Sequence, residues 1–239
     1  MVKNITIIGA SGGIGNAVIE HLSKSAKFEK ILACGRSEIS FNSPNIEYQT
    51  IDLTDEATIE AAAKRASEIG PQDLVFVTTG FLHNNDIKPE KSIRDLSIEG
   101  FEQNFAINTI GPALVAKHFL PVMRKDTKSV FACLSARVGS ISDNGLGGWY
   151  AYRASKAALN MVLKNLSIEA QRRYKQMIIL GLHPGTVNSS LSEPFQGNVS
   201  KEKLFTPLYS AEKLLSVIEN ATIKNSGDII AWDGQRIEY

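Results

Sequence analysis

The feature that most constrains the fold is an alternation of short apolar segments with longer segments of helical periodicity. Most of the short segments are apolar on successive residues, which is typical of strands covered on both faces. The short segments comprise residues 4–8, 30–34, 46–50, 73–78, 129–134, 177–182 and 228–231, and the longer ones comprise residues 13–25, 55–69, 101–124, 151–174 and 211–220. This alternation predicts an α/β fold with a doubly wound parallel sheet of about seven strands, right-handed crossovers and helices on both faces.

The chain of 239 residues has no internal repeat, low-complexity tract or proline-rich linker, so we expect one domain over residues 1–239. Its two longest irregular stretches, residues 79–97 and 185–206, each follow the carboxyl end of a predicted strand. Ligands bind at that edge of open α/β sheets. Both stretches are therefore candidate substrate walls, with a substrate loop near residues 185–206. An ordinary solvated loop is an equally good interpretation of residues 79–97.

The composition disfavours several classes of partner. Lys and Arg number 26 against 25 for Asp and Glu, so no strong field attracts nucleic acid or an anionic membrane, and we expect small-molecule partners. The N-terminal segment carries no export signal, which favours a cytoplasmic protein. The histidines lack ligand spacing, so no metal site is expected. Cys34 and Cys133 lie in apolar segments and are expected to be buried free thiols.

A glycine-rich loop joins the first predicted strand to the first predicted helix. Glycine allows the tight turn, lets the backbone approach a pyrophosphate and permits close packing of helix on strand. The helix N-terminus then offers free N–H groups and a positive dipole end to the phosphates. We therefore predict dinucleotide binding by Gly9, Ser11, Gly13, Ile14 and Gly15.

Tyr152 and Lys156 lie four residues apart at the start of a long helical segment, and therefore one turn apart on the same face. A phenol is a poor base at neutral pH, and an adjacent ammonium favours its ionised form. Tyr150 has only Ala154 four residues later, so the pairing argument selects Tyr152. Such a pair is commonly no more than a helix surface contact, but the preceding glycine loop favours a catalytic role.

With both motifs in this order, the chain resembles the short-chain dehydrogenase/reductase family over essentially its whole length. The glycine loop matches the family's Gly-x-x-x-Gly-x-Gly, and Tyr152 with Lys156 matches its Tyr-x-x-x-Lys. The resemblance implies a single-domain Rossmann fold. It further implies a catalytic role for Ser135 and Asn108, an adenine contact at Asp52 with Leu53, and nicotinamide contacts near Pro184, Gly185 and Thr186.

Segments 134–141 and 147–152 and the ending Trp232-Asp233-Gly234 most resemble the sniffer and C-factor subgroup. Two segments depart from the family pattern. Where the family has Asn-Asn-Ala-Gly after its fourth strand, residues 78–81 read Thr-Thr-Gly-Phe, and only Gly80 remains as a cofactor contact. Asn188 stands where the family usually has threonine, which leaves open the group that binds the nicotinamide carboxamide.

The cofactor preference is predicted from the tip of the second strand, which carries no acid and ends in Gly35-Arg36-Ser37. An acid there would bind the ribose hydroxyls of NAD and repel a 2′-phosphate. Arg36 instead offers a planar fork of donors to a phosphate, assisted by Ser11 or Ser37. We therefore predict NADP(H), with NAD(H) as the less favoured alternative. An exposed arginine without a ligand is the structural alternative.

Together these residues predict an enzyme of the carbonyl reductase or alcohol dehydrogenase type. Tyr152 would donate or accept the proton, Lys156 would lower the phenol pKa and hold the nicotinamide ribose, and Ser135 would hydrogen-bond the substrate oxygen. Asn108 would carry a proton relay, or else close a helix kink as a structural amide. The alternative function is a dinucleotide-binding regulatory or signalling protein with little turnover.

Two further expectations concern the substrate and the assembly. A partly apolar substrate pocket is expected from a set of loop residues: Phe81, Leu82, Leu146, Trp149, Leu191, Pro194 and Phe195. The helical segments 101–124 and 151–174 carry apolar residues on more than one face. This pattern, with the family resemblance, predicts a homodimer or homotetramer, unless a neighbouring loop covers the extra face.

Overall fold

The computed structural model describes residues 4–25, 28–198 and 200–239, and its centre is one eight-stranded sheet. The strand order is β10-β9-β6-β5-β4-β1-β2-β3, and every neighbouring pair is parallel except β10 with β9. The strands are β1 Asn4–Ile8, β2 Lys30–Gly35, β3 Ile46–Thr50, β4 Leu74–Val77, β5 Ser129–Leu134, β6 Met177–His183, β9 Ile229–Ala231 and β10 Arg236–Ile237. The predicted doubly wound sheet is confirmed, with one more strand than expected.

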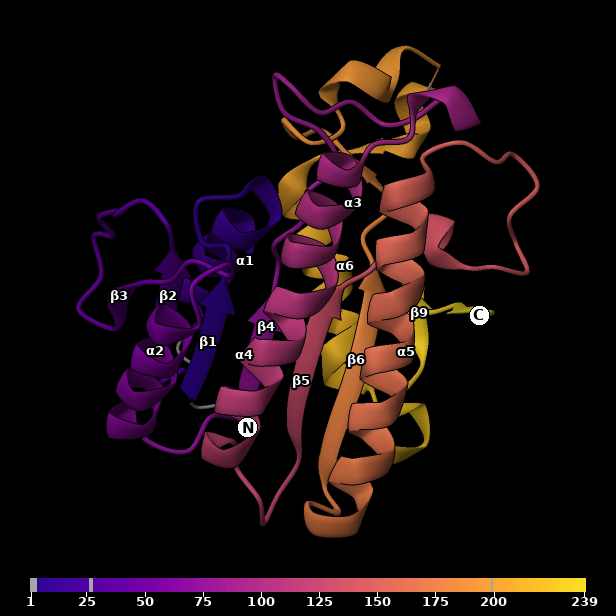
Figure 1. Cartoon of the computed structure of the whole chain (residues 1–239). Coiled ribbons are helices and arrows are strands. Elements are labelled where there is room, and N and C mark those ends of the chain that lie inside the picture. The colour runs from indigo at the N-terminus through magenta and orange to yellow at the C-terminus, as the bar shows by residue number, and fades with distance from the viewer. Residues whose placement is uncertain (1–3, 26–27, 199) are drawn as a thin grey trace.

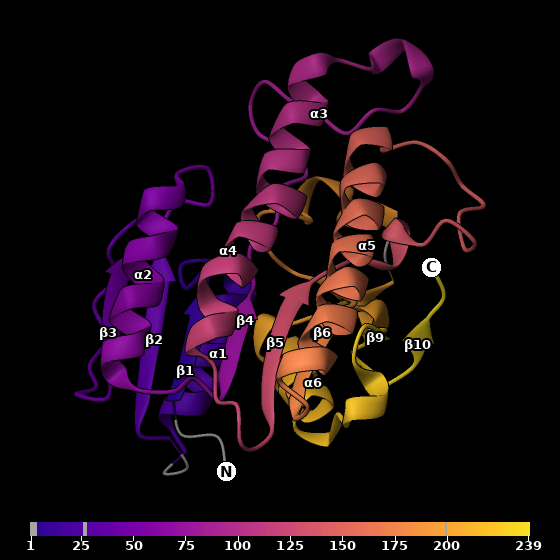
Figure 2. The same ribbon diagram turned by 60° about the horizontal axis from the view of Figure 1, so that its bottom comes forward.

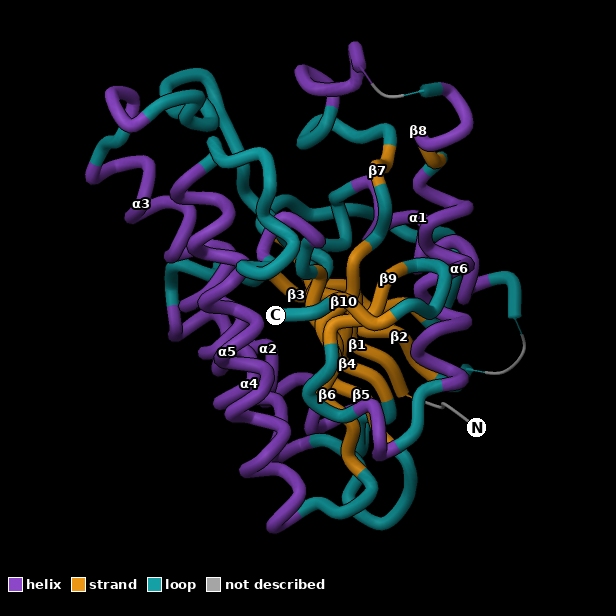
Figure 3. The backbone as a smooth tube through the Cα atoms, turned by 90° about the vertical axis from the view of Figure 1, so that its right-hand side faces the viewer, coloured by secondary structure: helices purple, strands orange, loops and turns teal. Residues whose placement is uncertain are grey.

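Helices cover both faces of this sheet, as Figures 1 and 3 show. The helices α2 Glu56–Ile69, α4 Gly111–Phe119 and α5 Tyr150–Arg173 lie on one face. The helices α1 Gly13–Ser23 and α6 Pro207–Asn220 lie on the other. Because both faces are covered, the central strands are buried throughout, and the free Cys34 and Cys133 are 0% and 1% exposed as predicted.

The helix predicted over residues 101–124 is a composite of several pieces. It begins earlier, as α3 Ile98–Phe105, passes through a π-helical turn at Ala106–Ile110, and continues as α4 before a short 3-10 turn at Leu120–Val122. Figure 2 shows α3 rising past the end of the sheet above α4. A π-turn inserts one extra residue per turn and commonly marks a functional position. Asn108 is in this turn.

The loop predicted over residues 185–206 contains a small sheet of its own. Strands β7 Thr186–Val187 and β8 Leu204–Phe205 pair in parallel beyond the carboxyl ends of the main strands (Figure 3). The loop of residues 79–97 lies at the same end and contains one short 3-10 turn, Ile93–Asp95. Both loops therefore border the edge where the predicted site residues meet. Within the described ranges, no helix is long and apolar enough to span a membrane.

Candidate active site

The glycine loop joins β1 to α1 through a backbone that admits no side chain at two positions. Gly9 has φ +97°, and a Cβ on Gly15 would lie 2.2 Å from the Gly9 carbonyl oxygen. The loop carries Ser11 and Gly13 on its exposed side, while Ile14 is half-buried against the core behind it. No side chain of the described residues caps α1, so its first N–H groups face the open side of the loop.

Thr78 is the first residue of the segment that departs from the asparagine pattern implied by the resemblance. Its Oγ1 donates to the Ile8 carbonyl oxygen at 2.8 Å and thereby ties β4 to β1 beneath the loop. A Cβ on Gly15 would lie 2.6 Å from the same Oγ1, so loop and threonine fit closely together. The neighbouring Thr79 Oγ1 is buried without a hydrogen-bond partner in the described chain. Gly80 follows in an exposed position. A Cβ added to Gly80 would lie 3.9 Å from Lys156 Nζ.

Replacing Gly15 with alanine is expected to destabilise the loop strongly. The added methyl group would lie 2.2 Å from the Gly9 oxygen, a backbone atom that cannot move aside without displacing β1. We expect a loss of about 2–4 kcal/mol in unfolding free energy and loss of dinucleotide binding. Chemical denaturation provides the measurement. The matched control is Gly145→Ala, where no atom lies within 4 Å, and equal losses in both variants would contradict the steric argument.

The adenosine end of the predicted site lies at the tip of β2. Arg36 and Ser37 are exposed there, directly after the strand. Tyr48 Oη on β3 contacts the carbonyl oxygens of Gly35 and Ser37 at 2.5 and 2.7 Å, which fixes this turn. A Cβ on Gly35 would lie 3.7 Å from Ser11 Oγ, so the glycine loop borders the same turn. Tyr48 is a supporting residue that the sequence analysis missed.

Asp52 and Leu53 follow β3 at the same edge. Asp52 Oδ1 accepts hydrogen bonds from the Thr54 N–H and Oγ1 at 2.9 and 2.7 Å. These bonds lower the pKa of Asp52, and the positive charge of Arg36 adds to the effect. Leu53 is 7% exposed and packs against Gly111. A Cβ added to Gly111 would lie 2.6 Å from the Leu53 Cβ. The carboxylate is therefore charged and held in place beside Arg36.

Tyr152 and Lys156 occupy one face of α5, in its first two turns. They are 8% and 2% exposed, and Lys156 Nζ lies 5.8 Å from the centroid of the phenol ring. Lys156 Nζ also donates to the Leu134 carbonyl oxygen at the end of β5, at 2.8 Å. The predicted pair is thus assembled by the helix, and the last residue of β5 fixes the ammonium.

The protonation states of this pair differ from the sequence-based expectation. Burial raises the pKa of Tyr152 to about 12, and burial lowers the pKa of Lys156 to about 8. The expected lowering of the phenol pKa by Lys156 is therefore wrong for the structure, because the phenol is removed from water, which disfavours its charged form. At neutral pH the site presents a neutral phenol, which is the form that can donate a proton.

Ser135 follows β5 and is held by a residue that the sequence analysis missed. Its Oγ donates to Asn160 Oδ1 at 2.6 Å, and both residues are 3% exposed. Asn160 lies one turn beyond Lys156 on the same face of α5. A serine hydroxyl has one proton, and here that proton is donated to Asn160. In this arrangement Ser135 Oγ can only accept further hydrogen bonds, and the hydroxyl must rotate before it can donate to another group.

Asn108 lies in the π-turn, fully buried, with its amide directed at neighbouring groups. Its Oδ1 accepts the Phe81 N–H at 2.8 Å, and its Nδ2 donates to the Phe81 carbonyl oxygen at 2.8 Å. The same Nδ2 lies 3.1 Å from Ser155 Oγ and 3.2 Å from Asn104 Oδ1. The amide therefore joins the loop after β4 to the π-turn and to α5, which is the structural alternative considered for it.

An apolar cluster from three loops encloses the Tyr152 ring: Leu82, Ala136, Val138, Trp149, Leu191 and Phe195. Trp149 meets Tyr152 at 6.2 Å and Phe195 at 5.0 Å between ring centroids, both edge to face. Leu146 is a correction to the expected lining, because it is 94% exposed and does not belong to this cluster. Pro194 is exposed too. Phe81 does not belong to this cluster, and its backbone is hydrogen-bonded to Asn108.

The segment after β6 has a shape that requires glycine. Gly185 has φ +76°, and a Cβ there would lie 2.5 Å from the Phe205 ring. The Pro184 carbonyl oxygen accepts from Ser210 Oγ at 2.9 Å, and Thr186 begins β7. Asn188 is exposed; its N–H donates to the Phe205 oxygen at 2.8 Å and its Oδ1 accepts from Gln196 at 3.2 Å.

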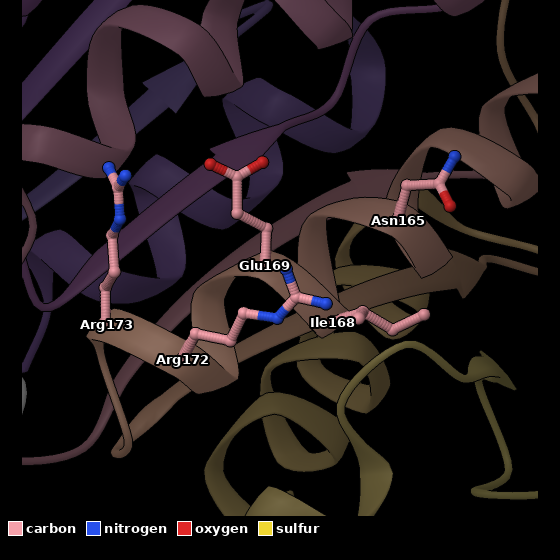
Figure 4. A pocket seen from close by; sticks show the side chains of 5 residues that line it. All are labelled: Asn165, Ile168, Glu169, Arg172 and Arg173. Atoms are coloured by element: carbon pink, nitrogen blue, oxygen red, sulfur yellow. The ribbon is translucent and has the colours of Figure 1, made fainter.

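These residues fit a bound dinucleotide. Along the carboxyl edge of the sheet lie an uncapped helix N-terminus, an exposed arginine beside the glycine loop, and a buried ammonium beside a buried phenol. Thr79, whose hydroxyl has no hydrogen-bond partner among the described residues, lies beside Gly9 of the glycine loop. By contrast, the hollow in Figure 4 is formed by the outer, carboxyl-terminal half of α5 and includes none of the predicted residues: Asn165, Ile168, Glu169, Arg172 and Arg173. In the described ranges, no cluster of His, Cys, Asp or Glu could hold a metal ion.

Comparisons with known proteins agree on one family. The model of the short chain dehydrogenase family matches residues 3–199. A 1-hydroxy-2-glutathionyl-2-methyl-3-butene dehydrogenase from Rhodococcus sp. (strain AD45) is 29% identical over 240 residues, covering 100% of both chains. The C-signal protein of Myxococcus xanthus is 29% identical over 62% of this chain and 84% of its own. The NADPH-bound carbonyl reductase from chicken fatty liver has a TM-score of 0.87 at 25% identity, over 100% of this chain and 99% of that one.

Proposed function

Because the chain belongs to the short chain dehydrogenase family, we propose that it is an NADP(H)-dependent oxidoreductase that interconverts a carbonyl and an alcohol. The observation that carries this proposal is the buried Tyr152–Lys156 pair, which lies at the same sheet edge as the glycine loop. The NADPH-bound carbonyl reductase neighbour supports the cofactor and the reaction class.

In this proposal each side chain has a distinct task. The bound dinucleotide supplies or accepts the hydride. Tyr152, neutral at physiological pH, gives its hydroxyl proton to the carbonyl oxygen. The Lys156 ammonium stabilises the phenolate that this transfer leaves and holds the nicotinamide ribose. Ser135 hydrogen-bonds the substrate oxygen once its hydroxyl rotates from Asn160. We propose Asn108 as the inner member of a water-mediated proton path, alongside its structural bonds to Phe81.

Turnover with a panel of carbonyl compounds tests the proposal. We expect NADPH consumption with some aldehydes, ketones or quinones, together with thermal stabilisation by NADPH. The similarity to the C-signal protein favours a second candidate, a dinucleotide-binding signalling protein. Stabilisation by NADPH without turnover of any panel member would favour that second function. If NADPH neither stabilised the protein nor was consumed with any panel member, both proposed functions would be contradicted.

Replacing Arg36 with alanine is expected to weaken NADPH far more than NADH. The exposed guanidinium beside Ser37 and the glycine loop would bind the 2′-phosphate, which NADH lacks. Loss of a charged hydrogen bond costs roughly 2 kcal/mol, or about 30-fold in the dissociation constant for NADPH. Titration calorimetry with both cofactors measures the change, and Arg94→Ala, also exposed, is the control. Equal losses for both cofactors, or a wild-type preference for NADH, would refute the proposed binding of the 2′-phosphate by Arg36.

We also propose a homodimer or homotetramer. Large apolar side chains are exposed along the outer surface of the π-turn and α5: Ile110 at 52%, Met161 at 62% and Ile168 at 48%. Apolar residues that stay exposed along adjacent helices are typical of a surface that a second subunit covers.

A further inference from the structure

Glu90 is a buried carboxylate beside the start of α5. It is 5% exposed in the loop of residues 79–97, and none of the described lysines, arginines or histidines forms an ion pair with it. Its two oxygens accept the Ala151 N–H of α5 at 3.4 and 3.3 Å. A Cβ on Gly100 would lie 3.5 Å from Oε1, so the carboxylate fits between α3 and the first turn of α5. A buried charge needs compensation, and here the helix N-terminus supplies it.

The same residue also holds the backbone that enters this helix. Trp149, the N-cap of α5, has φ 50° and ψ 45°, and among the described residues it alone has a positive φ without being glycine. This left-handed conformation is unfavourable for a bulky residue and persists only where neighbouring contacts hold it. The Trp149 N–H donates to the Glu90 carbonyl oxygen at 2.6 Å. Glu90 therefore secures the strained cap with its main chain and the next turn with its side chain.

These contacts lie next to the reacting phenol. Ala151 immediately precedes Tyr152, and the Trp149 ring meets the Tyr152 ring edge to face. Trp149 supplies no side-chain cap of its own, so the first turn of α5 depends on the Glu90 contacts. Arg153 braces the other side of the entry, with its Nε donating to the Gly148 carbonyl oxygen at 3.0 Å.

We propose that Glu90 is a positioning residue for Tyr152, which clamps the strained entry of α5 and thereby sets the place of the phenol. The proposal rests on the proposed function, in which Tyr152 donates the proton. It assigns to the loop of residues 79–97 a task beyond forming a wall: the loop fixes the orientation of the catalytic helix. Glu90 itself touches no reacting atom.

Kinetics of Glu90→Ala and Glu90→Gln test this role. We expect Glu90→Ala to lower kcat about tenfold or more while the KM for NADPH stays within about threefold, because small displacements of a catalytic group reduce rate more than binding. Glu90→Gln keeps an acceptor oxygen and is expected to restore most of kcat. The control is Asp55→Ala, which removes the acceptor of the Ala57 N–H at the start of α2, a comparable helix-start contact far from Tyr152 in the sequence, and is expected to leave kcat unchanged. A normal kcat in folded Glu90→Ala would overturn the proposal.

Amide hydrogen exchange gives a second measurement that does not need turnover. We expect the Ala151 amide, which donates to the Glu90 side chain, to exchange faster in Glu90→Ala than in wild type, and Glu90→Gln to stay close to wild type. Absence of turnover in the wild type would refute the proposed function, whereas unchanged exchange at the Ala151 amide would refute the positioning role of Glu90. Faster exchange together with unaltered kcat would show a purely structural cap and would equally overturn the positioning role.

Discussion

Tyr152→Phe is expected to lower kcat for carbonyl reduction by about a thousandfold, within the range that general acid catalysis contributes. The substitution removes one hydroxyl and keeps the ring that packs against Trp149 and Leu82. Burial holds the Tyr152 pKa near 12, so the proton that is lost is present in the wild type at neutral pH. The dissociation constant for NADPH should stay within about threefold, since the glycine loop and Lys156 are unchanged.

Stopped-flow rates and fluorescence titration with NADPH measure these two effects separately. The matched control is Tyr150→Phe, two residues earlier on the same helix, where the side chain is 39% exposed and has no lysine one turn later. We expect wild-type turnover from this control. Near wild-type turnover in Tyr152→Phe would show that another group supplies the proton.

The sequence predicted the parts of the fold that depend on local pattern. Runs of buried apolar residues located the central strands to within a residue or two, because strands covered on both faces carry an unbroken apolar signal. Strands β7, β8 and β10 have two residues each and are defined by their partners, so no local period marks them. The π-turn at Ala106–Ile110 was missed because one inserted residue hardly alters a helical pattern.

The site was predictable where one motif carries it and not where distant segments meet. Asn160 continues the four-residue spacing of Tyr152 and Lys156, so that spacing was a usable signal for a third residue on the same face. Glu90 meets Ala151 across 61 residues of sequence, and Tyr48 meets Gly35 across 13, with no motif at either place. The phenol pKa was misjudged because spacing reveals a neighbouring charge but not the depth of burial.

Lys156→Ala is expected to impair both chemistry and cofactor binding. The side chain is 2% exposed, its ammonium bonds the Leu134 oxygen at 2.8 Å, and it is the cation beside Tyr152. Removing it should lower kcat by about a hundredfold and raise the dissociation constant for NADPH about tenfold, as expected for loss of a buried charged hydrogen-bond donor. Unchanged NADPH affinity would remove the ribose-holding role, and unchanged kcat would remove the charge-balancing one.

The pH dependence of Lys156 provides the sharper test. Burial lowers its pKa from 10.5 to about 8 in the folded protein, so the ammonium is lost as pH rises through about 8, and NADPH affinity and reductase activity should fall with it. Lys156→Arg stays charged and should lack this fall.

Between about pH 8 and 10.5 the unfolded chain binds the extra proton, so this group makes the wild type more stable as pH rises there. Lys156→Met keeps much of the volume without the charge and should lose that rise in stability. If its stability rose with pH just as the wild type's does, another group would have to be titrating.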